Sequence, residues 1–235
     1  MNLDAVTIVL VHPKTPANVG SACRALKTMG ISRLAIVGSP DTLDEQEVTT
    51  VAVHAADIYR NAEFHEDLAG ALEGASLSVA VTRRTGARRN KLHLSPRELP
   101  AYVEERGDAE VAVVFGNEGH GLTTGEVAEC STMLSIPTSP AFPSLNLSHA
   151  VQIVTYELFA YGGNLTQKRN VARIGDVREL VSVVWGTLDD LGFYRNTDGH
   201  ESARFFQDLF ERAGMRRFEI DYLKRIFEKI RYMAR

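Results

Sequence analysis

Short apolar runs recur at intervals along the first two thirds of the chain. Each run is four to seven residues long and is rich in Val, Ile and Leu, which is the pattern of parallel strands covered on both faces. We therefore predict five strands. They span Ala5–Val11, Arg33–Val37, Leu77–Val81, Val111–Phe115 and Met133–Ile136.

Segments with helical periodicity lie between these runs. After the first run, Thr15 and Pro16 predict the start of a helix and Gly30 predicts its end. The apolar residues of this helix form one face, and Arg24 points away from it. Further helices are predicted over 42–57, 65–72, 124–130 and from Leu145 to about residue 161. Strands that alternate with helices in this way predict an α/β domain with a parallel sheet.

The pattern changes after Tyr161. Residues 161–175 are polar, aperiodic and contain glycine, which predicts a linker. From Asp176 to the end only helical patterns occur, starting with a predicted capping box of Asp176 and Glu179, and their apolar stripes need one another for burial. We therefore expect three regions: an α/β domain over 1–160, a linker over 161–175 and a small all-helical domain over 176–235.

The composition is that of a globular protein, since 44% of the 235 residues are hydrophobic. No run approaches the ~20 apolar residues of a membrane-spanning helix, and the N-terminus lacks the features of a signal peptide, so we expect a cytoplasmic protein with no membrane partner. The two cysteines, Cys23 and Cys130, lack the spacing of a disulfide framework or a zinc site. We expect two buried or near-surface thiols and no metal.

Charge is distributed unevenly along the chain. Residues 1–160 contain 12 Lys and Arg against 19 Asp and Glu, whereas residues 161–235 contain 14 against 11. The densest basic cluster, within 83–91, consists of Arg83, Arg84, Arg88, Arg89 and Lys91. The structural alternative for the 83–91 cluster is a surface loop without a partner. For the basic residues at the end of the chain, the alternative is a solvated face of the last helix. The acidic surroundings favour a phosphate-bearing partner for the 83–91 loop.

Two loops that leave the carboxyl ends of predicted strands are the strongest candidates for a ligand site. The first loop contains Gly116, Glu118, Gly119 and Gly121, and the second, 137–144, contains three prolines. Open α/β sheets bind ligands at this edge. The chain has no nucleotide-phosphate P-loop, HExxH or GxSxG motif, and its glycines lack the dinucleotide-binding spacing. A small polar cofactor held mainly by main-chain groups fits these loops best.

Three segments then carry a family resemblance: TPANVGSACRALKTMG, VVFGNEGHGL and IPTSPAFPSLNLSHAVQIVTYEL. In this order, they resemble the three signature motifs of the SPOUT class of RNA methyltransferases, in its TrmH-like group of 2′-O-methyltransferases. The residues of these motifs and the helical tail are most similar to those of the TrmJ-type enzymes, which methylate the ribose of cytidine or uridine 32 in the tRNA anticodon loop. The resemblance implies an α/β-knot domain with a C-terminal trefoil knot, S-adenosylmethionine as cofactor and a homodimer.

The resemblance also implies site residues. Cofactor contacts fall on Val81, Thr82, Arg83, Gly116, Ile136, Pro143, Ser144 and Leu145. The other active-site positions match Asn18, Arg24, Glu118 and Asn146, with Ser144 shared between the two sets. Arg24 and the basic cluster, Arg83, Arg84, Arg88, Arg89 and Lys91, would face RNA. His120 falls at a variable position of its motif, so we assign it no catalytic role.

Arg24 is a poor candidate for the base that accepts the ribose proton, because a guanidinium has a pKa above ~12. We expect Arg24 to hold the adjacent phosphate and orient the hydroxyl, with proximity supplying much of the acceleration. Three alternatives remain at this point: ribosomal RNA as the substrate, a non-catalytic RNA-binding protein of the same fold, and a metabolite-binding α/β enzyme unrelated to RNA. The retained motif residues argue against the second, and the basic loop and tail argue against the third.

Overall fold

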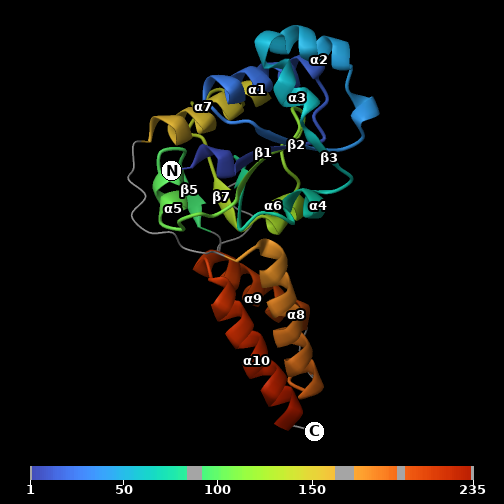
Figure 1. Cartoon of the computed structure of the whole chain (residues 1–235), viewed down its shortest axis with the longest axis vertical. Coiled ribbons are helices and arrows are strands. Elements are labelled where there is room, and N and C mark those ends of the chain that lie inside the picture. Colours follow the sequence, from blue (N-terminus) through green and yellow to red (C-terminus); the bar gives the residue numbers. More distant parts are fainter. Residues whose placement is uncertain (1, 84–91, 162–171, 195–198, 234–235) are drawn as a thin grey trace.

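A parallel sheet organises the first part of the molecule (Figure 1). The computed structural model describes residues 2–83, 92–161, 172–194 and 199–233. Within them, the seven strands lie in the order β3-β2-β1-β6-β4-β7-β5. Their bounds are β1 Val6–Val11, β2 Arg33–Val37, β3 Glu63–His65, β4 Leu77–Val81, β5 His93–Leu94, β6 Val111–Phe115 and β7 Thr132–Leu134.

The five predicted strands are confirmed, with the last beginning and ending slightly earlier than expected. Strands β3 and β5 were not predicted, and they lie at the two edges of the sheet. Both are short, with three and two residues, and contain His or Glu. Edge strands pair on one side only, and so they do not need the continuous apolar run of a central strand.

Helices cover both faces of the sheet. The alternation of side chains in β1 sends Ile8 and Leu10 into one core and Val9 and Val11 into the other. The first core is covered by α1 Pro16–Thr28, α2 Glu45–Ala52, α3 Ala56–Arg60, α5 Leu99–Glu104 and α7 Leu147–Ala160. The second is covered by α4 Leu68–Leu72 and α6 Thr124–Glu129. The carboxyl ends of the strands therefore remain as the open edge.

The predicted helix over 42–57 is interrupted. Helix α2 ends at Ala52 because Val53 takes a positive φ of 53°, and a 3₁₀ turn over Val53–Ala55 leads into α3. A β-branched residue is unfavourable in this conformation, so no local rule predicts the break there. Similarly, the predicted helix over 65–72 begins only at Leu68, and α5 was not predicted.

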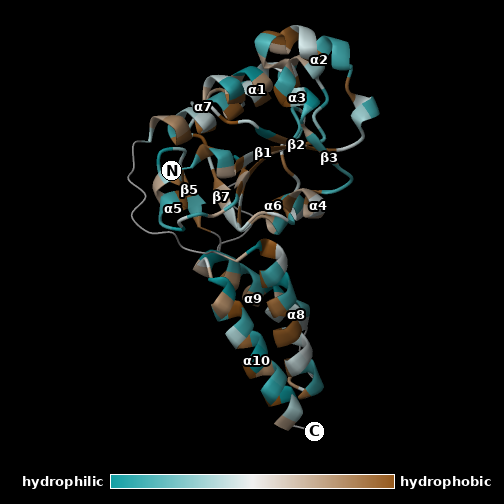
Figure 2. Cartoon of the chain, viewed as in Figure 1, coloured by the Kyte–Doolittle hydropathy of each residue, from teal (hydrophilic) through white to brown (hydrophobic). Residues whose placement is uncertain are grey.

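Three helices form the tail: α8 Ile174–Asp190, α9 Gly199–Ala213 and α10 Arg217–Met233. Figure 2 shows apolar and polar positions alternating along them, and their apolar side chains form a separate cluster around Leu180, Val184 and Ile220. The predicted capping box is wrong in position, because α8 begins before Asp176. The Asp176 carboxylate accepts the Arg173 N–H at 3.2 Å, inside the first turn.

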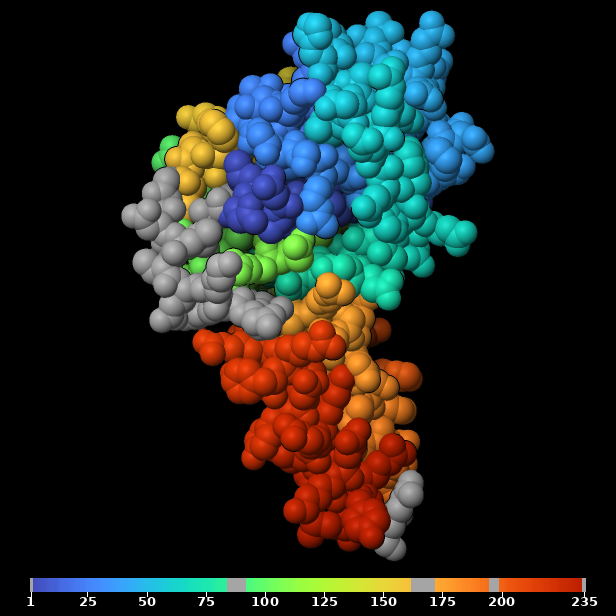
Figure 3. Space-filling model, in the orientation of Figure 1, coloured from blue at the N-terminus to red at the C-terminus, as the bar shows by residue number. Residues whose placement is uncertain are grey.

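The tail is joined to the α/β body through a short packed segment, as the space-filling view also indicates (Figure 3). The Ile174 N–H donates to the Ala75 carbonyl at 2.7 Å, and its side chain is buried in the second core of the sheet. The Ala172 N–H donates to the Met215 carbonyl at 2.8 Å. The end of the predicted linker is therefore packed structure, while residues 162–171 lie outside the described part.

The described residues can be compared with the expectations for membrane-spanning helices, metal sites and cysteines. No helix among them is long and apolar enough to cross a membrane, and no group of three or more His, Cys, Asp or Glu among them is arranged to hold a metal ion. Cys23 and Cys130 are free and buried, as expected. Burial raises the pKa of the Cys23 thiol to about 12, so it is protonated at neutral pH.

The contact between α1 and α2 provides a test of the packing that holds these helices. A Cβ atom on Gly20 would lie 2.5 Å from the Val48 carbonyl oxygen and 2.9 Å from the Val51 Cβ. We expect Gly20→Ala to lower the free energy of unfolding by ~1–3 kcal/mol through overpacking, measured by urea denaturation.

Gly186 in the middle of α8 provides the matched control. A Cβ atom there meets nothing within 4 Å. We expect Gly186→Ala to raise the free energy of unfolding by ~0.5–1 kcal/mol, because alanine is the better helix former. Equal effects of the two substitutions would contradict the close α1–α2 approach.

Candidate active site

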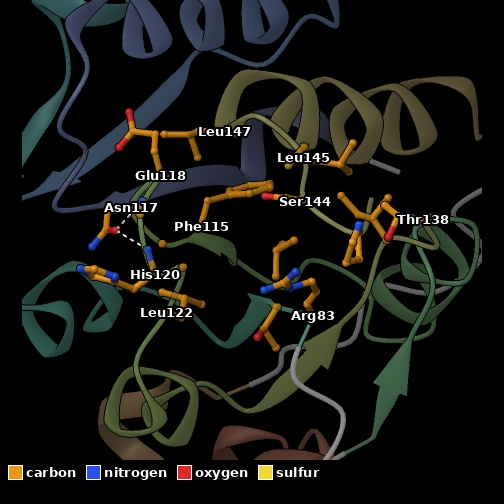
Figure 4. A pocket seen from close by; sticks show the side chains of 18 residues that line it. Arg83, Phe115, Asn117, Glu118, His120, Leu122, Thr138, Ser144, Leu145 and Leu147 are labelled. Atoms are coloured by element: carbon orange, nitrogen blue, oxygen red, sulfur yellow. Dashed lines mark hydrogen bonds between the residues drawn. The ribbon is translucent and has the colours of Figure 1, made fainter. Parts of the chain in front are cut away.

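The glycine loop after β6 is folded tightly against itself. A Cβ atom on Gly116 would lie 2.1 Å from the carbonyl carbon of Gly121, so only glycine fits at position 116. The Gly121 N–H closes the loop by donating to the Asn117 carbonyl at 2.9 Å. The Asn117 Oδ1 accepts the N–H groups of Gly119 and His120 at 3.0 and 2.9 Å (Figure 4). The loop is thus fixed by its own hydrogen bonds.

A cavity of about 430 Å³ lies beside this loop, at the carboxyl ends of β4, β6 and β7 and the start of α7. The volume lies within the range of sites for small ligands. Four separate segments of the predicted cofactor site meet here. All eight of its residues line the cavity: Val81, Thr82, Arg83, Gly116, Ile136, Pro143, Ser144 and Leu145.

The cavity also contains residues that the sequence motifs did not single out. Phe115, Leu122 and Leu147 supply apolar walls, and Thr138 supplies a hydroxyl. Figure 4 shows Arg83 and Glu118 on different sides of the cavity, with the Glu118 carboxylate directed away from Arg83. His120, to which we assigned no catalytic role, lines the cavity as well. Phe115 and Leu122 lie within the VVFGNEGHGL motif, and Leu147 directly follows the predicted Asn146, so the motif segments contained these apolar residues without marking them as site residues.

Glu118 forms one network with two other predicted active-site residues, Asn18 and Asn146. Its Oε1 accepts the Asn18 Nδ2 at 2.9 Å, and the Asn146 Nδ2 donates to the Asn18 Oδ1 at 2.8 Å. The same carboxylate accepts the backbone N–H groups of Lys14 and Thr15 at 3.0 and 3.1 Å. Asn146 also caps α7 by accepting the Ser148 N–H at 2.8 Å. The network therefore fixes the starts of α1 and α7 against the glycine loop.

The hydrogen bonds around Glu118 lower the pKa of its carboxyl group. Partial burial acts on the Glu118 carboxyl most strongly and raises its pKa. The Asn18 amide and the Lys14 and Thr15 N–H groups act in the opposite direction, and together they hold the pKa of Glu118 below its usual value of 4.5. The group is thus an anion at neutral pH, and its lone pairs are already directed to protein donors.

Arg24 does not line this cavity. It follows Asn18 by six residues in α1, which places it on another side of the helix, and its side chain is exposed. It lines a separate depression of about 320 Å³ together with Lys27, Thr28 and residues 52–55. The structure therefore joins Asn18, Glu118 and Asn146 in one network, of which Glu118 lines the cavity, and leaves Arg24 outside the cavity.

Only one residue of the predicted basic cluster falls in the described part of the chain. Arg83 lines the cavity. Arg84, Arg88, Arg89 and Lys91 lie outside the described residues. Their predicted contact with RNA stays a prediction.

Comparisons with known proteins agree with these motifs. The model of the SpoU rRNA Methylase family matches residues 5–156. The chain belongs to this family. The membership confirms the resemblance found in the sequence, and the matched residues contain the whole sheet together with both ligand loops.

Relatives of the SpoU-family chain extend over its full length, tail included. A protein of Pectobacterium atrosepticum, named tRNA (cytidine/uridine-2′-O-)-methyltransferase TrmJ, is 32% identical and covers 97% of both chains. One of Pseudomonas aeruginosa, named tRNA (cytidine/uridine/adenosine-2′-O-)-methyltransferase TrmJ, is 32% identical over 99% of this chain and 96% of its own. The crystal structure of TrmJ from Z. mobilis has a TM-score of 0.79 and 25% identity, covering 95% of this chain and 98% of that one.

Glu118→Gln tests the network of this SpoU-family site. A glutamine side chain has a single acceptor oxygen and cannot serve Asn18, Lys14 and Thr15 together. We expect a loss of about 1 kcal/mol in the free energy of unfolding at pH 7, after allowance for solvent screening of this partly exposed group.

The pH dependence supplies the control for this variant. Because the folded pKa of Glu118 is lowered, its stabilisation is complete well above pH 4.5 and is lost as the pH falls through the folded value. The difference between wild type and Glu118→Gln, measured by chemical denaturation, should therefore shrink as the solution is acidified. A difference that stays constant down to pH 3 would contradict a role for the charge.

Proposed function

We propose that this protein transfers a methyl group from S-adenosylmethionine to the ribose 2′-hydroxyl of a tRNA nucleotide. One observation carries the proposal: the eight residues expected to contact the cofactor come from four segments and line a single cavity. The names of the full-length relatives support tRNA as the substrate. The TrmJ-type resemblance of the motifs and tail points to cytidine or uridine 32 in the anticodon loop.

The cavity suits S-adenosylmethionine. Gly116, Gly119 and Gly121 line the cavity and have no side chains, so a ligand can approach the backbone of the loop closely. Phe115, Leu122 and Leu147 offer apolar surface, and Thr138 and Ser144 offer hydroxyls. When bound, S-adenosylmethionine supplies a methyl group on a positively charged sulfur.

The residues of the chain bind and orient the reacting groups. The Glu118–Asn18–Asn146 network holds the two cofactor loops at a fixed separation, so the cavity is formed before ligands enter. Arg83 and Arg24 supply positive charge for the phosphates on either side of the ribose. A guanidinium is too weak a base to take the hydroxyl proton, so the role of Arg24 is to hold the phosphate and orient the hydroxyl.

The proposal includes a homodimer, in which a second copy supplies Arg24 to the cavity. The position of Arg24 outside the cavity of its own chain supports this part of the proposal. Helix α7 packs against α1 and exposes two aromatic side chains, Tyr156 at 53% and Phe159 at 55%, which provide an apolar surface for this second copy (Figure 1). Arg24 lies on the helix beside this surface.

The remaining parts of the proposal concern the chain path and the tail. Residues 1–160 form the catalytic domain, with a trefoil knot at its C-terminal side, and residues 176–235 form an RNA-recognition domain. The separate apolar cluster of the three tail helices supports this division. Five Lys and Arg of α10 support an RNA-facing role of the tail: Arg217, Lys224, Arg225, Lys229 and Arg231. The protein acts in the cytoplasm, where tRNA is its partner.

The function is tested by incubating purified protein with S-adenosylmethionine and unmodified tRNA. We expect nucleoside mass spectrometry to find 2′-O-methylcytidine or 2′-O-methyluridine, located at position 32 by fragment mapping. Methylation of ribosomal RNA in place of tRNA would support the alternative substrate. The absence of any methylated RNA with bound S-adenosylmethionine would support the non-catalytic alternative.

The sharing of sites between two copies is tested with two inactive variants. Arg24→Ala removes the guanidinium, and Ser144→Trp fills the cavity from an exposed loop. Each homodimer should be inactive. A heterodimer purified through two different tags should recover about half the wild-type rate, because it contains one complete site of two. A heterodimer without activity would show that Arg24 acts within its own chain.

A further inference from the structure

A second cavity, of about 750 Å³, lies at the carboxyl ends of β1, β2 and β3 and has no part in the proposed cofactor site. It is lined by the segments that leave these three strands. Its residues are His12, Pro13, Lys14, Gly38, Ser39, Pro40, Thr42, Phe64, His65 and Glu66. None of them belongs to the motif positions to which a role was assigned above.

The wall of this cavity is built with an unusual backbone. His12 has a φ of 47°, and His12 and Val53 are the two non-glycine residues with positive φ among those described. The His12 Nδ1 lies against Gly38, where an added Cβ would come within 3.3 Å of it, and Gly38 itself has a φ of 131°. Two backbone hydrogen bonds of 2.9 Å, from His12 to Val37 and from Gly38 to His65, fix this arrangement. Strained residues held in this way cluster at functional sites.

The lining is suited to a flat heterocyclic ring. His12, Phe64 and His65 contribute three flat rings to the lining, and Ser39, Thr42 and Glu66 contribute polar groups. Lys14 lines the same cavity, and its side chain makes no ion pair with the residues that the structure describes. An apolar slot with a free cation beside it matches a nucleobase and its phosphate.

The second cavity is connected to the cofactor cavity. The Lys14 N–H donates to the Glu118 Oε2 at 3.0 Å, and Glu118 lines the cofactor cavity. The second cavity lies at the end of β2, and the cofactor cavity lies at the end of β4. These two strands are three positions apart in the sheet, which corresponds to a separation of ~14 Å. A few unstacked nucleotides of a loop span this distance along the same edge of the sheet.

We propose that this cavity binds an unstacked nucleobase of the RNA substrate, near the nucleotide that is methylated, with Lys14 on a neighbouring phosphate. The inference rests on the proposed function and goes beyond it, since it adds a second point at which the enzyme reads the RNA loop. Stacking on His12 and Phe64 holds the base, and Glu66 and Ser39 face its edge.

Binding of unmodified tRNA to the full-length protein, measured by fluorescence anisotropy, tests the proposal without requiring methylation. His12→Asn removes the ring and tolerates the positive φ, whereas His12→Phe keeps a flat ring. We expect His12→Asn to raise the Kd for tRNA about tenfold and His12→Phe to restore most of the affinity. Unchanged binding of S-adenosylmethionine by calorimetry confirms that each variant is folded.

Lys14→Ala provides the second arm, because it keeps the backbone N–H that holds Glu118. We expect the slope of log Kd against log salt to fall by about one, the change that corresponds to the loss of one phosphate contact. Arg60→Ala is the matched control, since Arg60 is an exposed cation of α3 that lines none of the three cavities described above. Equal salt slopes for Lys14→Ala and Arg60→Ala would overturn the phosphate contact.

A double-mutant cycle locates the base. Each loop nucleotide is replaced in turn by an abasic one, and the loss of affinity is compared in wild type and His12→Asn. At one position near the target, the abasic RNA should bind wild type more weakly but should bind His12→Asn as well as intact RNA does. Additive losses at every position would overturn the proposal. This inference alone would be overturned if the wild type methylates tRNA and every His12 and Lys14 variant binds tRNA normally. The proposed function would be overturned as well if the wild type neither binds nor methylates tRNA.

Discussion

The Glu118 carboxylate is the interaction on which the geometry of the site depends. It is bound by Asn18 and by two backbone N–H groups at the start of α1, and Asn18 in turn is bound by Asn146 at the start of α7. In sequence, Asn18 is 100 residues from Glu118 and 128 residues from Asn146. Because the carboxylate is an anion with a lowered pKa, it holds three chain segments together with charge-assisted hydrogen bonds.

This constraint works together with the steric one at Gly116. The glycine loop folds back so closely that no side chain is possible at Gly116, and the residues of this loop line the cavity. The sheet supplies the third element, since β4, β6 and β7 end at the same edge. These three features give the cavity a preformed shape, and the proposed function adds positive charge for the RNA from Arg24, from Arg83 and from the tail.

The central strands and the cofactor cavity were predictable from the sequence, because continuous apolar runs and glycine-rich or proline-rich loops have local causes. The contents of the cavity were predictable only through the family motifs, since no local rule brings Val81 next to Leu145. Other features had no local signal. The break at Val53 and the edge strands β3 and β5 depend on tertiary contacts. The exposure of Arg24 did follow from the periodicity of its helix, but its separation from the cavity did not, because the family motifs place it with the active-site residues. The second cavity also went unpredicted, because its residues belong to no motif.

A crystal structure of the protein with bound S-adenosylmethionine is the most direct test of the proposed cofactor site. We expect density for the cofactor between Gly116 and Leu145, with its polar atoms against the main chain of the glycine loop and of the 136–145 segment. Density in the cavity lined by His12 and His65, or a cofactor held mainly by charged side chains away from Gly116, would contradict it.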